Sequence, residues 1–350
     1  MTAKSSSPRD AAGSGRRPTI GDVAARASVS KSAVSFVFNN RPGVSAASSE
    51  RIRRAAEELG WQPSARARAL SQSTSQTIGL VIRRAPELLS TDPFFPQFVA
   101  GVETELASRG YALLLQVVAD DAAERAAYER FARESRVDGV FLTDMRVGDD
   151  RPAQLSELGL SAAVVAPPVE DPTAVGMDDG AGVRRAVLHL SSLGHRRIGH
   201  VAGPRAYVHS SLRQHAWEDA LAELGLPSGP VAAADFTGEG GARATHELLD
   251  LPEPPTAIVY ANDLMAIAGM AAASSRGLRV PEDLSVVGFD DVPLAPFVAP
   301  PLTTVKQNVV AWGAAAAETL VAMVEHRDLP AVALPDVEFI VRRSTARPRA

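Results

Sequence analysis

From residue 77 onward, short apolar strands alternate with helical segments. The apolar runs predict strands at 77–82, 111–118, 139–143, 162–166, 197–203, 256–261 and 284–290. Helical periodicity predicts helices at 94–109, 121–135, 180–193, 211–224, 240–249 and 263–276. This alternation favours an α/β architecture of parallel sheets, split here into two subdomains. In such folds, ligands bind at the carboxyl ends of the strands.

Residues 19–59 follow a different pattern, that of three short helices. Thr19 and Asp22 form a candidate capping box for a helix that ends near Ala27, and Ser30 can cap a second helix from residue 31 to about 38. Two short helices joined by so tight a turn favour a helix-turn-helix. A third helix is expected to begin at Ser45 and to bury residues 52, 55, 56 and 59.

The second helix is the candidate recognition helix. Val34 and Val37 are expected in the core, which leaves the other face free to contact DNA. We assign base-edge contacts to Lys31, Ser32 and Phe36. The candidate phosphate and flanking contacts are Thr19, Ser35 and Asn39.

Charge is divided unevenly along the chain. Residues 1–72 contain 12 Lys and Arg against 5 Asp and Glu, a net charge of +7. The remaining residues contain 24 basic and 36 acidic side chains, a net charge of −12. The basic end has the sign that neutralises phosphates, whereas DNA would repel the acidic body.

Length and composition indicate an ordinary soluble protein of two or three domains. The 350 residues include no cysteine, which excludes disulfides and thiolate metal sites and fits a reducing compartment. No apolar run reaches the length of a membrane span, and residues 1–17 lack the apolar core of a secretory signal. We expect residues 1–17 to be a disordered tail and the protein to be cytoplasmic, associated with the nucleoid when bound to DNA.

The segments TIGDVAARASVSKSAVSFVFNN and RPGVSAASSERIRRAAEELGWQPSARARAL resemble, piece by piece, the headpiece of LacI/GalR-type transcriptional repressors. Within them, AEELGWQPSARARAL is similar to the hinge helix of that family. The resemblance covers residues 18–345, because PPLTTVKQN and PDVEFIVRRST are similar to the chain crossover and the final strands. It implies a small all-α helix-turn-helix domain followed by an α/β core of two parallel-sheet subdomains, the type I periplasmic binding protein-like fold.

The resemblance also implies domain boundaries and a role for the hinge. It places the helix-turn-helix domain at 18–62, the hinge helix and linker at 63–76, and the core at 77–345. The N-subdomain would hold about 77–176 and 306–334, and the C-subdomain about 177–305 and 335–345. Leu70 matches the leucine that wedges into the minor groove, and Ala67 matches the small residue where the hinge helices cross. Leu70 could instead be a core leucine at a domain junction, but the flanking Arg66 and Arg68 favour the wedge.

A candidate effector site lies at the strand ends. Phe94 and Phe95 follow the first strand, Asp144 follows the third, and Asp178 precedes a helix. The two phenylalanines could also be core residues at a helix start. The residues that match the family's effector-contacting positions, or line the same pocket by resemblance, are Tyr207, His209, Arg213, Phe236, Asn262 and Asp290. Of these, His209 could be a loop histidine without a critical role.

The chemistry of this set suits a polyhydroxylated ligand. Carboxylates and an amide bond to hydroxyls, arginine offers a rigid donor fork, and aromatic faces pack on sugar C–H groups. We therefore expect a sugar or sugar derivative, with a purine or nucleoside as the alternative.

Three positions depart from the family pattern. Phe36 stands where many relatives carry arginine, so it could touch a thymine methyl or shield the helix. Ala166 replaces a commonly acidic residue, and Ala216 replaces the glycine of the arginine motif. These departures bear on which operator is read and which effector fits.

No enzyme motif is present in the sequence. TGEGGA at 237–242 lacks the lysine and the spacing of a P-loop, and the seven histidines show no HExxH spacing. There is no G-x-S-x-G nucleophile elbow. We expect no catalysis, no metal and no cofactor.

The sequence thus predicts a homodimeric repressor that binds a palindromic operator, responds to a sugar-like effector by a population shift and has no membrane partner. An activator of the same build remains open, as does a cytoplasmic sugar-binding protein that does not read DNA. The core alone would also fit a periplasmic-type solute-binding protein, but the headpiece and the N-terminus argue against a secreted one.

Overall fold

The computed structural model describes residues 16, 18–39, 41–62, 74–84, 92–166 and 173–349. Contacts divide the chain into two units, Met1–Ser75 and Gln76–Ala350. Most of the predicted tail at 1–17 and the hinge residues Ala67 and Leu70 lie outside the described residues.

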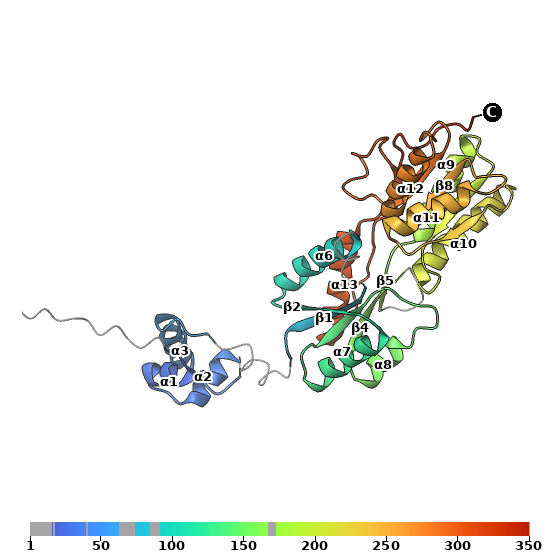
Figure 1. The fold of residues 1–350 in the computed structure, drawn as a ribbon. Coiled ribbons are helices and arrows are strands. Elements are labelled where there is room, and N and C mark those ends of the chain that lie inside the picture. The colour runs from blue at the N-terminus through green and yellow to red at the C-terminus, as the bar shows by residue number, and fades with distance from the viewer. Residues whose placement is uncertain are drawn as a thin grey trace, which may run out of the picture. The chain divides into compact units, whose positions relative to one another are not determined.

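The first unit is a bundle of three helices, α1 (Ile20–Ala27), α2 (Lys31–Phe38) and α3 (Ala46–Glu58), shown in Figure 1. The Asp22 carboxylate accepts hydrogen bonds from the Thr19 N–H and the Thr19 hydroxyl, each at 2.7 Å. The Ser30 hydroxyl accepts from the Ala33 N–H at 3.1 Å and so caps α2. Ser28 adopts a left-handed conformation between α1 and α2, with φ of 53°. The predicted helix-turn-helix is confirmed.

The core of this unit is small. Val23, Val34 and Ile52 are fully buried, one from each helix. The expected burial of Val37 is also observed, as is that of residues 55 and 56, whereas Leu59 is only half-buried. So small an apolar core leaves most of the helical surface to polar side chains.

The second unit contains two sheets. The five-stranded sheet has the order β2-β1-β3-β4-β5 and is parallel throughout. The six-stranded sheet has the order β11-β10-β9-β8-β6-β7 and is parallel except for β11. The strands of the first sheet are β1 (Thr77–Arg83), β2 (Ala112–Val118), β3 (Gly139–Leu142), β4 (Ser161–Val165) and β5 (Ala174–Val175). Those of the second are β6 (Ile198–Ala202), β7 (Val231–Ala233), β8 (Ala257–Tyr260), β9 (Ser285–Asp290), β10 (Thr303–Lys306) and β11 (Glu338–Ile340).

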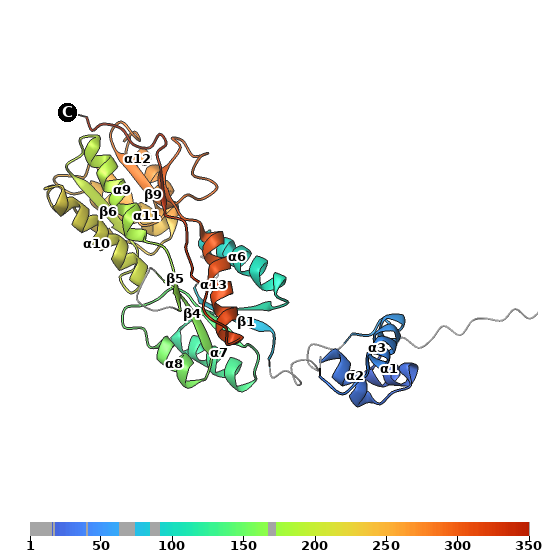
Figure 2. The same ribbon diagram turned by 180° about the vertical axis from the view of Figure 1, so that it is seen from behind.

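Helices cover both faces of each sheet, as Figures 1 and 2 show from opposite sides. We call the five-stranded sheet and its helices the first lobe; these helices are α6 (Phe94–Ser108), α7 (Asp121–Arg133), α8 (Arg151–Glu157) and α13 (Val309–Val324). The six-stranded sheet and its helices form the second lobe; these helices are α9 (Asp179–Ser192), α10 (Val208–Glu223), α11 (Gly238–Leu249) and α12 (Asp263–Ser275). No helix among the described residues is long and apolar enough to cross a membrane.

The return of the chain to the first lobe depends on two glycines. After β10 the chain crosses back and α13 packs against α6. A Cβ at Gly101 would meet the Val310 carbonyl, and a Cβ at Gly313 would meet the Phe98 carbonyl. These positions therefore let the two helix backbones approach closely.

The main predicted strands and helices are present, but four elements were not predicted individually: α8, β5, β7 and α13. Helix α10 also begins at Val208, three residues before the predicted start. The Val208 N–H donates to the Met145 carbonyl of the first lobe at 2.8 Å. This long-range bond satisfies one of the free N–H groups of the first turn, and no local sequence pattern signals it.

Candidate functional site

The predicted DNA-contacting residues gather on α2 and its flanks. Lys31 and Ser32 are exposed at the start of α2, and Phe36 is 37% exposed one turn further on. The Phe36 ring lies against Gly43, where a Cβ would be 3.5 Å away. The ring thus also packs on the loop after α2, which fits the shielding interpretation.

Two other candidates serve the headpiece itself. The Asn39 amide donates to the Ser35 hydroxyl at 3.1 Å across the last turn of α2. The Thr19 hydroxyl, as described above, bonds to Asp22. Both groups would have to share or exchange these bonds to contact a phosphate.

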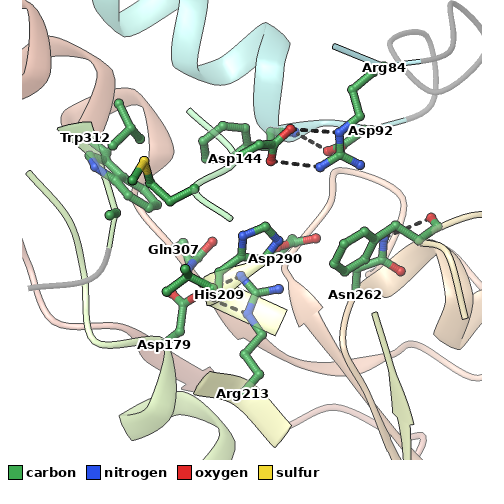
Figure 3. A pocket seen from close by; sticks show the side chains of 16 residues that line it. Arg84, Asp92, Asp144, Asp179, His209, Arg213, Asn262, Asp290, Gln307 and Trp312 are labelled. Atoms are coloured by element: carbon green, nitrogen blue, oxygen red, sulfur yellow. Dashed lines mark hydrogen bonds and ion pairs between the residues drawn. The ribbon is translucent and has the colours of Figure 1, made fainter. Parts of the chain in front are cut away.

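The candidate effector pocket lies between the two lobes and draws its lining from both. Figure 3 shows one arginine–aspartate pair on each side of it, Arg84 with Asp144 and Arg213 with Asp179. Both pairs stand near the carboxyl ends of parallel strands, where the α/β architecture predicts a ligand site.

Arg84 and Asp144 form a bidentate pair. Arg84 Nε and Nη2 each donate to a carboxylate oxygen of Asp144 at 2.8 Å. The guanidinium carbon lies 4.9 Å from the centre of the Tyr207 ring and 5.6 Å from that of Phe236, both in the second lobe. Burial alone would raise the pKa of Asp144, but the charge and hydrogen bonds of Arg84 outweigh it and hold that pKa below its usual value.

Arg213 pairs with Asp179 inside the second lobe. Its Nε donates to Asp179 at 3.0 Å, and its Nη1 donates to the Ala261 carbonyl at 2.7 Å. One face of the guanidinium covers the Phe289 ring at 3.7 Å, and the Gln307 amide donates to the second oxygen of Asp179. Burial raises the pKa of Asp179 even though Arg213 and Gln307 favour the ionised form.

Two further carboxyls face the pocket without forming an ion pair with a described arginine. Asp290 ends β9 with φ of 117°, and Asp92 precedes α6 and accepts from the Phe94 N–H at 3.0 Å. Burial raises the pKa of both carboxyl groups, that of Asp290 strongly. Beneath Asp290, Asp263 accepts from the Val292 N–H at 2.8 Å and from the Thr304 hydroxyl, and burial raises its pKa to about 7.

Aromatic rings form two walls. In the second lobe, His209 stacks against Tyr207 and Phe236, with ring centres 5.5 Å apart in each case. Burial lowers the pKa of His209 to about 3, so its ring is neutral. In the first lobe, Phe94 meets Trp312 edge to face at 5.6 Å. Such faces suit the apolar side of a sugar or a planar base.

Seven of the predicted effector residues line the pocket: Phe94, Asp144, His209, Arg213, Phe236, Asn262 and Asp290. Asn262 has little freedom, because its amide oxygen caps α12 at Met265 and its nitrogen donates to the Phe236 carbonyl at 3.1 Å. His209 belongs to the first turn of α10 rather than to a loop.

Three predicted residues stand outside the lining. Phe95 is buried beneath the pocket at 3% exposure. Asp178 is exposed and caps α9 through the Ala181 N–H at 3.1 Å, so that its neighbour Asp179 faces the pocket instead. Tyr207 is set back behind His209 and Arg84 and supports both.

The sequence interpretation missed several lining residues, among them Arg84, Asp92, Asp179, Gln307 and Trp312. Asp92 and Asp179 were detectable in principle, since Asp179 adjoins the chosen Asp178 and Asp92 stands two residues before the chosen Phe94. Gln307 lies in the segment that resembles the chain crossover, which was given no site role, and Trp312 lies in α13, which was not predicted. Ala166, noted as a departure from the family, lines the pocket as well.

A short backbone contact joins the lobes beside the pocket. The Val147 N–H donates to the Ala206 carbonyl at 3.0 Å, and the Val208 N–H donates to the Met145 carbonyl at 2.8 Å. We call these two segments, 145–147 and 206–208, the interlobe clasp. Met145 and Val208 also line the pocket, so the clasp forms part of its wall.

Buried charges hold the clasp in place. Arg151 Nη2 donates to the carbonyls of Thr143 at 3.1 Å and Asp144 at 2.9 Å, which fixes Asp144 at its positive φ of 50°. Arg151 in turn pairs with the buried Glu124 at 2.9 Å, and Arg146 of the clasp reaches the same carboxylate. Arg151 and Glu124, which lie outside the pocket lining, therefore fix the backbone conformation at the end of β3 that faces the pocket.

Comparison with known proteins assigns the family. Residues 19–64 match bacterial regulatory proteins of the lacI family, and residues 187–345 match a periplasmic binding protein-like domain. The HTH-type transcriptional repressor CytR of Escherichia coli (strain K12) is 34% identical over 334 residues, 93% of this chain and 96% of CytR. The chain belongs to the LacI family of bacterial regulatory proteins.

Solved structures of LacI-family proteins agree with this assignment. A complex of the transcriptional regulator CelR with cellobiose has a TM-score of 0.72 and 32% identity, covering 94% of this chain and 100% of that one. The lac repressor dimer bound to operator and the anti-inducer ONPF has a TM-score of 0.82 and 28% identity, covering 95% and 100%. The predicted family, fold class and role as a DNA-binding transcriptional regulator are confirmed.

These relatives are transcriptional regulators rather than enzymes. Within the described ranges, no group of three or more His, Asp or Glu side chains is placed to hold a metal ion.

Proposed function

We propose that this chain represses transcription as a homodimer on a palindromic operator, and that a sugar or sugar derivative between the lobes controls it. The observation that carries the proposal is the combination, in one chain, of an exposed recognition helix and a pocket with paired carboxylates and stacked rings. A headpiece of this size reads only a half-site, which is why a two-fold dimer is needed. The structural relatives include a dimer on operator DNA and a cellobiose complex.

The ligand acts by favouring one arrangement of the lobes. Because the pocket and the interlobe clasp share Met145 and Val208, a bound ligand changes the stability of the contact that sets the lobe orientation. A ligand that binds the two arrangements with different affinity shifts their populations, and the DNA affinity shifts with them.

The test is operator binding by the full-length protein. A palindromic site is selected from random DNA, and its affinity is measured by fluorescence anisotropy across salt concentrations, with and without a panel of mono- and disaccharides and nucleosides. We expect specific binding that falls steeply with salt and one ligand class that changes it. Leu70→Ala, at a position outside the described residues, should weaken specific binding and leave the ligand affinity unchanged. Absence of any preferred DNA sequence would refute the operator proposal.

A further inference from the structure

Both guanidinium groups of the pocket are already engaged. Arg84 uses two of its nitrogens on Asp144. Arg213 uses its nitrogens on Asp179 and the Ala261 carbonyl, while Phe289 covers one of its faces. A ligand phosphate or carboxylate could gain a bidentate arginine contact only by displacing a carboxylate that holds the same geometry.

Two carboxyl groups of the pocket lie in the field of its guanidinium groups but form no close ion pair with them: Arg84 and Arg213 favour the ionised form of Asp92, and Arg213 favours that of Asp290. Neither Asp92 nor Asp290 forms an ion pair with any described residue, and Asp290 makes no hydrogen bond within that same part of the chain. Counted over the described lining residues, the pocket holds four carboxyl groups against two guanidinium groups.

These two carboxyl groups belong to opposite lobes. Asp92 begins the first-lobe segment that leads into α6, and Asp290 ends β9 of the second lobe. Burial is the main cause that raises the pKa of Asp290; the charge of Arg213 opposes this shift, and the charges of Asp263 and Asp92 add to it. An anion placed between the lobes would bind either against the charges of these acid groups or with the uptake of protons by them, and in a poorly solvated space both cost free energy.

We propose that Asp92 and Asp290 make the pocket selective for uncharged, hydroxyl-bearing ligands and exclude their phosphorylated and carboxylated derivatives. The inference rests on the proposed sugar effector and narrows its chemical class. Free carboxyl oxygens accept hydrogen bonds from ligand hydroxyls, which a neutral sugar supplies in number. The stacked rings of Tyr207, His209 and Phe236 would pack against the apolar face of the same ligand.

The first experiment compares matched ligands on the full-length wild-type protein. Thermal stability is measured, and binding is followed by isothermal titration, with cellobiose, glucose, galactose and mannose. Each monosaccharide is compared with its own 6-phosphate and its own uronate. We expect at least one neutral sugar to bind and its anionic derivatives to bind on the order of tenfold more weakly or worse.

Isosteric variants then test whether Asp92 and Asp290 cause the weaker binding of anionic sugars. Asp92→Asn and Asp290→Asn keep a carbonyl acceptor and remove the charge, and the double variant should bring the anionic derivatives to within about threefold of the neutral parent. The Asp92→Asn single variant should give part of this change even where Asp290→Asn weakens all binding. The matched control is Asp178→Asn, an exposed acid beside Asp179 that caps α9 outside the pocket, and it should change nothing.

The outcomes separate this inference from the function on which it rests. An anionic derivative that binds the wild type as tightly as its neutral parent overturns the charge selectivity and leaves the sugar effector standing. Discrimination that persists unchanged in the folded single and double variants overturns the role of these two residues. If no sugar of any charge binds, the sugar effector itself is wrong and the selectivity falls with it.

Discussion

Arg213–Asp179 and Arg84–Asp144 are both buried arginine–aspartate pairs, yet they differ in which parts of the fold they connect. The first pair joins α10 to α9 within the second lobe, and Gln307 and Ala261 complete its hydrogen bonds. The second pair belongs to the first lobe, but its guanidinium lies against Tyr207 and Phe236 of the other lobe. The same chemistry therefore stabilises one lobe in the first case and links the two lobes in the second.

The largest effect is expected from Arg213→Met, which leaves Asp179 buried without its cation. Breaking a buried pair in this way costs about 3–5 kcal/mol of unfolding free energy. Urea unfolding of the full-length protein measures this cost, and operator binding at low temperature checks that the headpiece is unaffected. A loss below about 1 kcal/mol would show that the site reorganises around Asp179.

Arg84→Met should have a smaller effect on stability and a larger one on lobe orientation. The Asp144 side chain is 15% exposed, so water can partly replace the lost guanidinium, and we expect a loss of about 1–3 kcal/mol. The chain has no cysteine, so single cysteines introduced on α8 and α11 can carry spin labels for distance measurement. The distance distribution should broaden in Arg84→Met and stay narrow in a folded Arg213→Met. Equal broadening in both would remove the distinction between the pairs.

The contributions of Asp144 and Asp179 to the unfolding free energy should change with pH in opposite directions. The pKa of Asp144 is lowered in the folded protein, so its contribution to stability is present above pH 4 and is lost as the pH falls further. The pKa of Asp179 is raised, so its contribution is greatest below pH 4 and decreases as the pH rises. Unfolding free energies of Asp144→Asn and Asp179→Asn, each compared with the wild type between pH 3 and 7, should therefore diverge in opposite directions. Slopes of the same sign would contradict this account.

The smallest effect is expected from Arg125→Ala, which removes an exposed ion pair with Asp150. Both side chains are more than half exposed, although they adjoin the buried Glu124 and Asp149 in sequence. Solvent screens such a pair, so neither stability nor ligand affinity should change measurably. This variant is the solvent-exposed reference against which the two buried pairs are judged.

The sequence predicted the fold well because its signals are local. Apolar strands alternating with helical periodicity fix the α/β class, and hydroxyl caps such as Ser30 fix helix starts within a residue. Two of the elements that escaped prediction, β5 and β7, are strands of only two or three residues that depend on pairing with a neighbouring strand. The other two are the helices α8 and α13.

The pocket was harder to predict because its geometry depends on distant partners. Arg84 and Asp144 are 60 residues apart, and nothing near Arg84 in the sequence indicates that its side chain turns inward. The choice of Asp178 over Asp179 failed by one position, since a helix start places one carboxylate on the cap and the next on the buried face. Family resemblance found Arg213, Phe236 and Asp290 because it carries three-dimensional information that local patterns lack.

The interlobe clasp has a consequence for anyone who would turn this chain into a biosensor for a new compound. Met145 and Val208 contact the pocket with their side chains and the opposite lobe with their backbones, so a library built at these positions would change selectivity and switching threshold together. Phe94 and Trp312 line the same pocket and take no part in the clasp. Redesign should therefore begin at these two aromatic residues, and the clasp should serve afterwards to tune the concentration at which the sensor responds.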